Sequence, residues 1–258
     1  MLTLAISSLS GGQGKTTTTL FLGRRLESLG IPTLLIDADP QHNLSVYLGL
    51  EREENEPSLL EFIKKNVDYT ETIYPSKFKD LFVIPADESL DDASDYLSSS
   101  GVGATLLKRR LDAVRNDFKV CLIDSPPQRS QLALTVIGAS NGLIIPAEAN
   151  LKGFGSLIRT LELLEGMVEI GATEATVWGV LPFRDRWVGR SQTNESKLAI
   201  EGIIGEVGKD KVLPSIRESE KYKQAINKQL TLTEMGFSDL EYPFETLTDM
   251  IQEHLSNE

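Results

Sequence analysis

Short apolar runs alternate with longer helical patterns along this chain, and the alternation strongly constrains the fold. Seven runs predict buried strands: Leu2–Ser8, Thr33–Asp37, Leu81–Pro85, Val120–Asp124, Gly142–Pro146, Thr176–Leu181 and Lys211–Leu213. The main helical patterns are Thr16–Leu29, Ala104–Arg115, Lys152–Met167, Ser191–Val207, Glu218–Gln229 and Pro243–Leu255. Such alternation builds right-handed βαβ units. We therefore expect an α/β fold in which residues 1–258 form a single domain, with one doubly wound, mostly parallel sheet and helices on both faces.

A glycine-rich segment joins the first predicted strand to the first predicted helix. Its glycines allow backbone N–H groups to surround phosphates, and the start of the helix favours negative charge. Lys15 is expected to neutralise the β- and γ-phosphates, and the Thr16 hydroxyl to bind Mg²⁺. The pattern of strand, GGxGKT and helix is typical of the P-loop of nucleotide-binding proteins. The predicted nucleotide-binding residues here are Gly11, Gly12, Gln13, Gly14, Lys15, Thr16 and Thr17.

Two acidic segments complete the predicted site. Asp37 and Asp39 end the second strand, where residues two apart face the same side. We expect Asp39 to orient or activate an attacking water and Asp37 to support the magnesium shell. Asp124 ends a further buried strand and is expected to hold Mg²⁺, through a water molecule. Lys15, Asp39 and Asp124 are thus the predicted catalytic residues, and Thr16, Asp37 and Asp124 the predicted metal site.

Composition excludes several classes of function. The 38 acidic and 26 basic residues give a net charge of −12, which argues against a uniformly basic, constitutive nucleic-acid binder. The single cysteine, Cys121, and the two histidines provide neither a disulfide framework nor a cysteine-based metal site. We found neither a signal peptide nor an apolar stretch of the roughly 20 residues that span a bilayer. The expected location is the cytoplasm.

Four segments together resemble the ParA/MinD family of deviant Walker ATPases: GGQGKTTTT, LLIDADPQHNLS, CLIDSPPQ and IIPAEANLKGFGSL. They occur in the order found in that family, and the likeness covers nearly the whole chain. The resemblance implies an ATP- and Mg²⁺-dependent homodimer that hydrolysis dissolves, with slow turnover that an adaptor protein stimulates. It also implies nonspecific binding to nucleoid DNA and a cellular cargo that the ATPase positions.

Ser10 departs from the pattern of this family. Members normally have a lysine at this position that reaches the nucleotide of the partner subunit, and serine supplies no charge. Lys152 is our leading substitute, although a lysine at a helix start is as often simply solvated. The serine, together with the lack of an N-terminal helix-turn-helix extension, is similar to the carboxysome-positioning McdA subgroup. Plasmid and chromosome partition ATPases are the near alternative.

The family resemblance also suggests a base pocket and a DNA-binding face. Pro214 and Ile216 follow the last predicted strand and are the candidates to pack on the adenine, with ordinary loop packing as the alternative. The candidate basic face consists of Arg184, Arg186, Arg190, Lys221, Lys223 and Lys228. Clustered positive charge is sufficient for binding the DNA backbone, and dimerisation doubles it. Glu218 and Glu220 dilute this charge.

Three other functions were considered. A membrane anchor of the MinD type has a basic polar face, whereas residues 234–258 contain seven acids and no Lys or Arg, so we expect this segment to pack on the domain. An iron–sulfur ATPase needs two cysteines per protomer, and this chain has one. A metabolic ATP-dependent enzyme and a nucleotide-switched binding module without turnover remain open alternatives.

Overall fold

The computed structural model describes residues 1–53 and 56–257. Its strands are β1 (Leu2–Ile6), β2 (Thr33–Asp37), β3 (Tyr74–Pro75), β4 (Leu81–Ile84), β5 (Val120–Asp124), β6 (Gly142–Glu148), β7 (Thr176–Asp185), β8 (Trp187–Val188), β9 (Ser191–Gln192) and β10 (Ile216–Arg217). Its α-helices are α1 (Lys15–Ser28), α2 (Asn43–Tyr47), α3 (Leu59–Lys64), α4 (Ala93–Ser99), α5 (Gly103–Leu111), α6 (Gln131–Ala139), α7 (Leu151–Glu169), α8 (Asn194–Val207), α9 (Lys221–Lys228) and α10 (Tyr242–Asn257). Short 3₁₀ turns lie at Tyr69–Thr72, Glu88–Asp92, Lys209–Lys211 and Ser238–Leu240.

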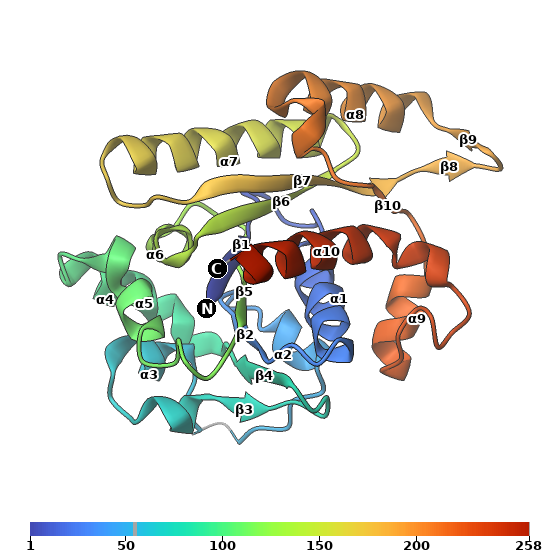
Figure 1. The fold of residues 1–258 in the computed structure, drawn as a ribbon. Helices are drawn as coiled ribbons and strands as arrows, with labels where there is room; N and C mark the ends of the chain where they lie inside the picture. The colour runs from blue at the N-terminus through green and yellow to red at the C-terminus, as the bar shows by residue number, and fades with distance from the viewer. Residues whose placement is uncertain (54–55, 258) are drawn as a thin grey trace.

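Eight of these strands form one twisted sheet in the order β10-β7-β6-β1-β5-β2-β4-β3 (Figure 1). All of its pairs are parallel except β3 with β4. The central strand β1 therefore lies between β5 and β6, and their carboxyl ends meet at one edge of the sheet. The expectation of a mostly parallel α/β sheet is confirmed.

Helices cover both faces of the sheet and enclose two apolar cores, because side chains alternate along each strand. One core joins strand residues such as Leu34, Ile36 and Ile123 to helices α3 to α8. The other core joins strand residues such as Leu35 and Leu122 to α1, α2, α9 and α10. Both faces of the central strands are thus buried, as the apolar runs in the sequence require.

Two predicted elements are wrong in detail. The segment predicted as strand Lys211–Leu213 begins in a 3₁₀ turn, and only Val212 bridges to Val180 in β7. The edge strand is instead β10, Ile216–Arg217. The helix predicted from Ser191 begins at Asn194, because Ser191 and Gln192 pair with β8 in a hairpin and Thr193 caps the helix through the N–H of Ser196. The sequence analysis also missed α3, α6 and the short antiparallel strand β3.

Candidate nucleotide-binding site

The predicted site residues converge at the carboxyl edge of three neighbouring strands. The glycine-rich segment follows β1, Asp124 ends β5, and Asp37 ends β2. In the sheet register Asp124 pairs with Ile6 on one side and with Asp37 on the other. Adjacent strands lie about 4.8 Å apart, so these two carboxylates are forced into close proximity. Ligands of open α/β sheets bind at such an edge.

The glycine-rich segment forms a tight loop that ends at the start of α1. Gly14 has φ 94° and lies against the ring of Phe183, since a Cβ built on Gly14 would approach that ring to 2.5 Å. Only glycine fits both conditions. Lys15 is almost fully buried, and its ammonium donates a 3.0 Å hydrogen bond to the Ser10 carbonyl. Burial lowers the pKa of Lys15, while the nearby carboxylates of Asp124 and Asp39 act in the opposite direction.

Asp124 is buried, and Lys15 is the positive charge near it. The residue is 1% exposed, and neither carboxylate oxygen accepts a hydrogen bond from residues 1–53 or 56–257. Burial raises its pKa well above the usual range, and Asp37 raises it further, whereas Thr16 and Lys15 lower it. A buried acceptor left unpaired is costly. A bound cation would pair with this carboxylate, so the geometry fits the predicted magnesium site.

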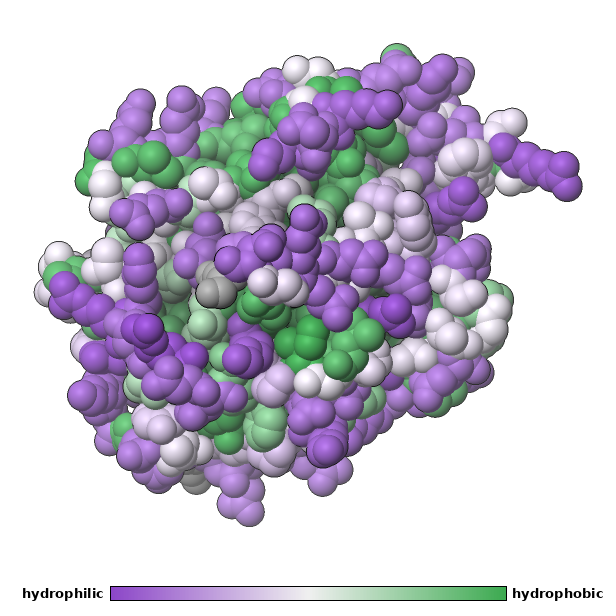
Figure 2. Space-filling model, in the orientation of Figure 1, coloured by the Kyte–Doolittle hydropathy of each residue, from purple (hydrophilic) through white to green (hydrophobic). Residues whose placement is uncertain are grey.

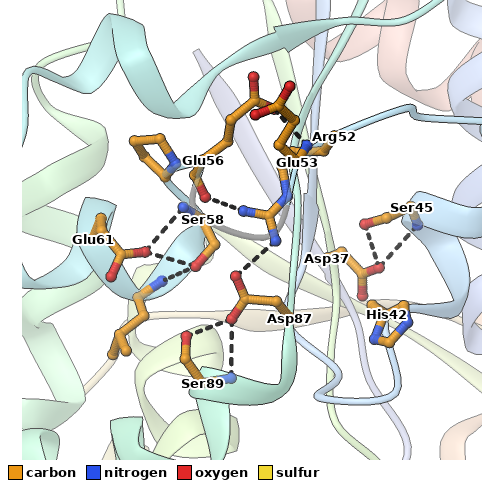
Figure 3. A network of polar contacts seen from close by, with 12 residues as sticks. Asp37, His42, Ser45, Arg52, Glu53, Glu56, Ser58, Glu61, Asp87 and Ser89 are labelled. Atoms are coloured by element: carbon orange, nitrogen blue, oxygen red, sulfur yellow. Dashed lines mark hydrogen bonds and ion pairs between the residues drawn. The ribbon is translucent and has the colours of Figure 1, made fainter.

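Asp37 is held by α2 (Figure 3). Its Oδ2 accepts hydrogen bonds from the backbone N–H of Ser45 at 2.9 Å and from the Ser45 hydroxyl at 2.8 Å. Burial raises the pKa of Asp37 to about 6, although these hydrogen bonds oppose the rise. Asp37 therefore fixes α2 to the end of β2. Its support of a magnesium shell stays a prediction. In the structure, Asp37 holds the segment that carries Asp39.

The loop surrounds a hollow of about 260 Å³, and Asp39 is one of the residues that line it. Residues 11–17 form its floor, and the remaining wall consists of Asp39, Asn43, Tyr47, Pro127, Phe183 and Arg184. Sequence reasoning missed Asn43 and Tyr47. The available signal was their i, i+4 spacing, which places both on one face of α2 directly after the acidic segment. The position of Asp39 fits a role in orienting water, and that role stays a prediction.

A second and larger hollow lies beside the first. It measures about 860 Å³ and contains no residue of the glycine-rich loop. His42, Ser45 and Val46 contribute to its wall, whereas Asn43 and Tyr47 contribute to the smaller hollow. Helix α2 therefore lies between the two. The predicted phosphate-binding residues line the smaller hollow and not the larger one.

Lys152 lies beside the glycine-rich loop of its own chain. Its ammonium is exposed and stands 3.5 Å from the carbonyl of Gly11. The preceding Leu151 is 84% exposed at the start of α7. An exposed lysine and leucine at the mouth of the site offer a contact to a second molecule. The assignment of Lys152 to a partner's nucleotide stays a prediction.

The comparisons with known proteins agree with this geometry. A family model described as an AAA domain matches residues 1–170. Maintenance of carboxysome distribution protein A (McdA) of Synechococcus elongatus is 49% identical over 97% of this chain and 99% of its own length. The chain belongs to the ParA-like family of P-loop ATPases. Within that family, the Soj protein of Bacillus subtilis is 32% identical over 69% of this chain and 70% of its own length.

Solved structures place the chain in the same family. A complex of Cyanothece McdA with ATP, made with an aspartate-to-alanine variant, is 47% identical, covers 99% of this chain and 96% of its own, and has a TM-score of 0.94. Cobyrinic acid a,c-diamide synthase from Mycobacterium smegmatis, solved with ADP and magnesium, has a TM-score of 0.76 at 23% identity over 92% of this chain and 96% of its own. The second likeness shows the fold alone.

Neither predicted adenine contact of this ParA-like protein, Pro214 or Ile216, lines the hollow at the glycine-rich loop. Pro214 lines a separate hollow of about 280 Å³ with Tyr222 and Tyr242. Ile216 is 1% exposed, because β10 pairs with β7 and turns this side chain into the core. The prediction that Ile216 packs on the base therefore does not fit this conformation. Pro214 stays a prediction.

The candidate basic face is partly neutralised. Arg184 pairs with Glu148 at 3.2 Å, Arg186 with Glu218 at 3.7 Å and Lys223 with Glu220 at 3.2 Å. Lys221 stands over the ring of Phe237. Arg190 and Lys228 are exposed, and neither forms an ion pair with any residue that the structure describes. Arg190 lies at the turn of the β8–β9 hairpin, which projects from the body and ends in hydrophilic side chains (Figure 2).

The C-terminal segment packs on the domain. Phe244, Leu247 and Ile251 of α10 are buried against α1, and the ring of Phe244 stacks on Phe21. Among the described residues, no helix is both long enough and apolar enough to cross a membrane. Cys121 is buried in β5, where burial raises the pKa of its thiol.

Proposed function

We propose that this chain is an ATPase that dimerises when it binds ATP and Mg²⁺, binds duplex DNA nonspecifically, and positions carboxysomes together with an adaptor protein. We place it in the cytoplasm on the nucleoid, and we treat residues 1–258 as one ATPase domain. The single observation that carries the proposal is the buried carboxylate of Asp124 beside the glycine-rich loop, whose oxygens accept no hydrogen bond from the described residues. Such a group fits a site that binds a cation and a phosphate together.

Each residue of the site has a distinct role in the proposal. The backbone N–H groups of residues 11–17 hold the phosphates, and Lys15 leaves the Ser10 carbonyl to neutralise their charge. Mg²⁺, when bound by Thr16 and Asp124, neutralises charge that develops on the phosphates. Asp39 orients the water that attacks the γ-phosphate. Asp37 holds the Asp39 segment through Ser45. Turnover is slow until the adaptor binds.

Dimerisation in this proposal depends on Lys152. Its side chain leaves Gly11 of its own loop and pairs with the phosphates bound by the partner subunit. Leu151 contributes apolar area to the same contact, since it is 84% exposed in the free chain. Hydrolysis removes the γ-phosphate and with it the charge that holds Lys152. The nucleotide thus shifts the population between two states with different DNA affinity.

DNA binding rests on the β8–β9 hairpin and α9, which carry Arg190 and Lys228. The dimer presents two copies of this face, so its affinity for DNA exceeds that of the monomer. The carboxysome as cargo is supported by the nearly full-length likeness to McdA, which is 49% identical. The likeness to Soj is 32% and covers 69% of this chain. A plasmid or chromosome partition role is therefore the second candidate.

The test measures phosphate release, dimer formation and duplex binding with ATP, with ADP and without nucleotide. We expect ATP alone to give dimers that bind duplex DNA and lose it as salt rises. Asp39→Ala should retain the dimer and lose phosphate release by at least about 100-fold. Equal phosphate release from both proteins would disprove the role of Asp39. No affinity for adenine nucleotides in the wild type would disprove the whole proposal.

The same measurements separate the remaining alternatives. A metabolic ATP-dependent enzyme would hydrolyse ATP only with its small-molecule substrate and would not respond to DNA. A nucleotide-switched binding module would form the ATP dimer and release no phosphate. Neither alternative has a specific observation in the structure that favours it.

A further inference from the structure

Gln13 stands in the glycine-rich loop but does not face the hollow with its amide. Its side chain is fully buried, and its Oε1 accepts a 2.8 Å hydrogen bond from the backbone N–H of Glu148 at the end of β6. Its Nε2 is buried and has no acceptor among the described residues. A backbone amide of the loop suffices for holding phosphate, so the glutamine side chain is free for another task.

The segment that Gln13 holds leads directly to Lys152. After Glu148 the chain turns sharply, with the N–H of Asn150 donating to the Glu148 carbonyl at 2.7 Å. Asn150 then caps α7 by accepting the N–H of Gly153 at 2.9 Å. A Cβ on Gly153 would come within 2.0 Å of the Glu148 carbonyl, so helix and turn are in direct contact. The short, hydrogen-bonded segment from Glu148 to Leu151 therefore connects the hydrogen bond of Gln13 to the start of α7.

Residues 148–152 contact the glycine-rich loop a second time. Lys152 returns to the same loop and stands 3.5 Å from the Gly11 carbonyl. Gln13 thus contacts the end of β6 through its buried side chain, and Gly11 contacts the start of α7 through the exposed ammonium of Lys152. A shift of the loop when phosphate enters must move both points, because the chain between them is constrained.

We propose that Gln13 is a positioning residue that couples the glycine-rich loop to Lys152. Through Glu148 it sets where the start of α7 stands, and so decides whether Lys152 reaches across a dimer once ATP is bound. In this proposal the Gln13 side chain acts only through Glu148, and its backbone N–H remains available to the phosphates. This inference rests on the proposed role of Lys152 in the ATP-bound dimer.

The first test uses the wild type at a concentration at which it is monomeric. Hydrogen exchange is followed with and without ATP and Mg²⁺. We expect ATP to slow exchange in the glycine-rich loop and, in the same titration, in residues 148–153. Slowing in the loop with no change in residues 148–153 would overturn the coupling. No slowing in the loop itself would instead remove the ATP site, and the inference with it.

The second test is a double-mutant cycle between Gln13→Met and Lys152→Ala, with Gln252→Met on the exposed face of α10 as the matched control. Methionine has a similar length and removes the hydrogen bond. We expect Gln13→Met to raise the dimer Kd in ATP about tenfold, as loss of one hydrogen bond to a buried amide should. Each dimer Kd is measured with the protein saturated with ATP, so that any change in ATP affinity is accounted for, and the control should match the wild type.

The cycle separates positioning from general stabilisation. If Gln13 acts through Lys152, the double variant dimerises no worse than Lys152→Ala alone, because the lysine that Gln13 positions is already gone. If the two effects multiply instead, Gln13 supports the dimer by another route and the inference is wrong.

Discussion

Replacing Asp124 by asparagine should stabilise the nucleotide-free protein and weaken its binding of Mg²⁺ and ATP. The reason is that burial of this carboxylate destabilises the free protein. Both of its oxygens are buried and neither accepts a hydrogen bond within the described chain. An unsatisfied buried acceptor costs about 1–3 kcal/mol, and a buried charge costs more. Asparagine is neutral at any pH and has nearly the same volume, so it avoids the cost of burying or protonating a carboxylate. We expect Asp124→Asn to raise the free energy of unfolding without nucleotide by about 1–2 kcal/mol.

The corresponding change in melting temperature follows from the size of the chain. At about 2–4 °C per kcal/mol, the nucleotide-free variant should melt about 2–8 °C higher than the wild type. With Mg²⁺ and ATP at 100 times Kd, the wild type should gain about 2.7 kcal/mol, or about 5–10 °C. The variant should lose most of this gain, since it lacks the carboxylate that faces the cation.

Thermal and urea unfolding with and without Mg²⁺ and ATP provide the assay. Asp68→Asn is the control, because Asp68 lies away from the site and caps a 3₁₀ turn by accepting the N–H of Thr70 at 3.0 Å. Asparagine caps as well as aspartate, so this variant should match the wild type in both conditions. A nucleotide-free Asp124→Asn protein that is less stable by more than about 1 kcal/mol would refute the reasoning. Its Asp124 would then make a contact that stabilises the fold.

Three further predictions follow from the same structure. Burial raises the pKa of Asp37 to about 6, above that of an unfolded aspartate. The free energy of unfolding without nucleotide should therefore fall by about 3 kcal/mol between about pH 4 and pH 6, because Asp37 ionises there in the unfolded chain but not in the folded protein. Asp37→Asn should flatten this part of a urea-unfolding series, and an unchanged slope would contradict it. Gly14→Ala should destabilise the protein by at least about 1–2 kcal/mol and abolish ATP binding, because its φ is 94° and Phe183 lies 2.5 Å from the new Cβ. Gly11→Ala is the control, and it should be nearly neutral in thermal unfolding because a Cβ there meets nothing within 4 Å. Arg190→Glu should weaken duplex binding by the dimer and reduce the slope of log K against log salt concentration by about 2, whereas Arg109→Glu on α5 should change neither. Equal loss of DNA affinity in both variants would point to net charge alone.

Much of the fold was predictable because the signals for it are local. The runs Thr33–Asp37 and Val120–Asp124 became β2 and β5 with the predicted bounds, since a continuous apolar run of five residues has few other ways to bury both faces. The errors in the strands lie at the edges of the sheet. There, strand β10 has only two residues, and its pairing with β7 depends on distant contacts that no local pattern encodes.

The sequence by itself determined which chemical groups meet at the site. A glycine-rich loop after β1 and carboxylates at the ends of β2 and β5 must converge, because parallel strands place their carboxyl ends at one edge of the sheet. The tertiary structure alone decided what each side chain does there. Gln13 meets Glu148 across 135 residues and Lys152 meets Gly11 across 141 residues, while Ile216 is withdrawn into the core. These contacts depend on strand order and on close packing between segments far apart in the chain, and neither leaves a periodic signal in the sequence.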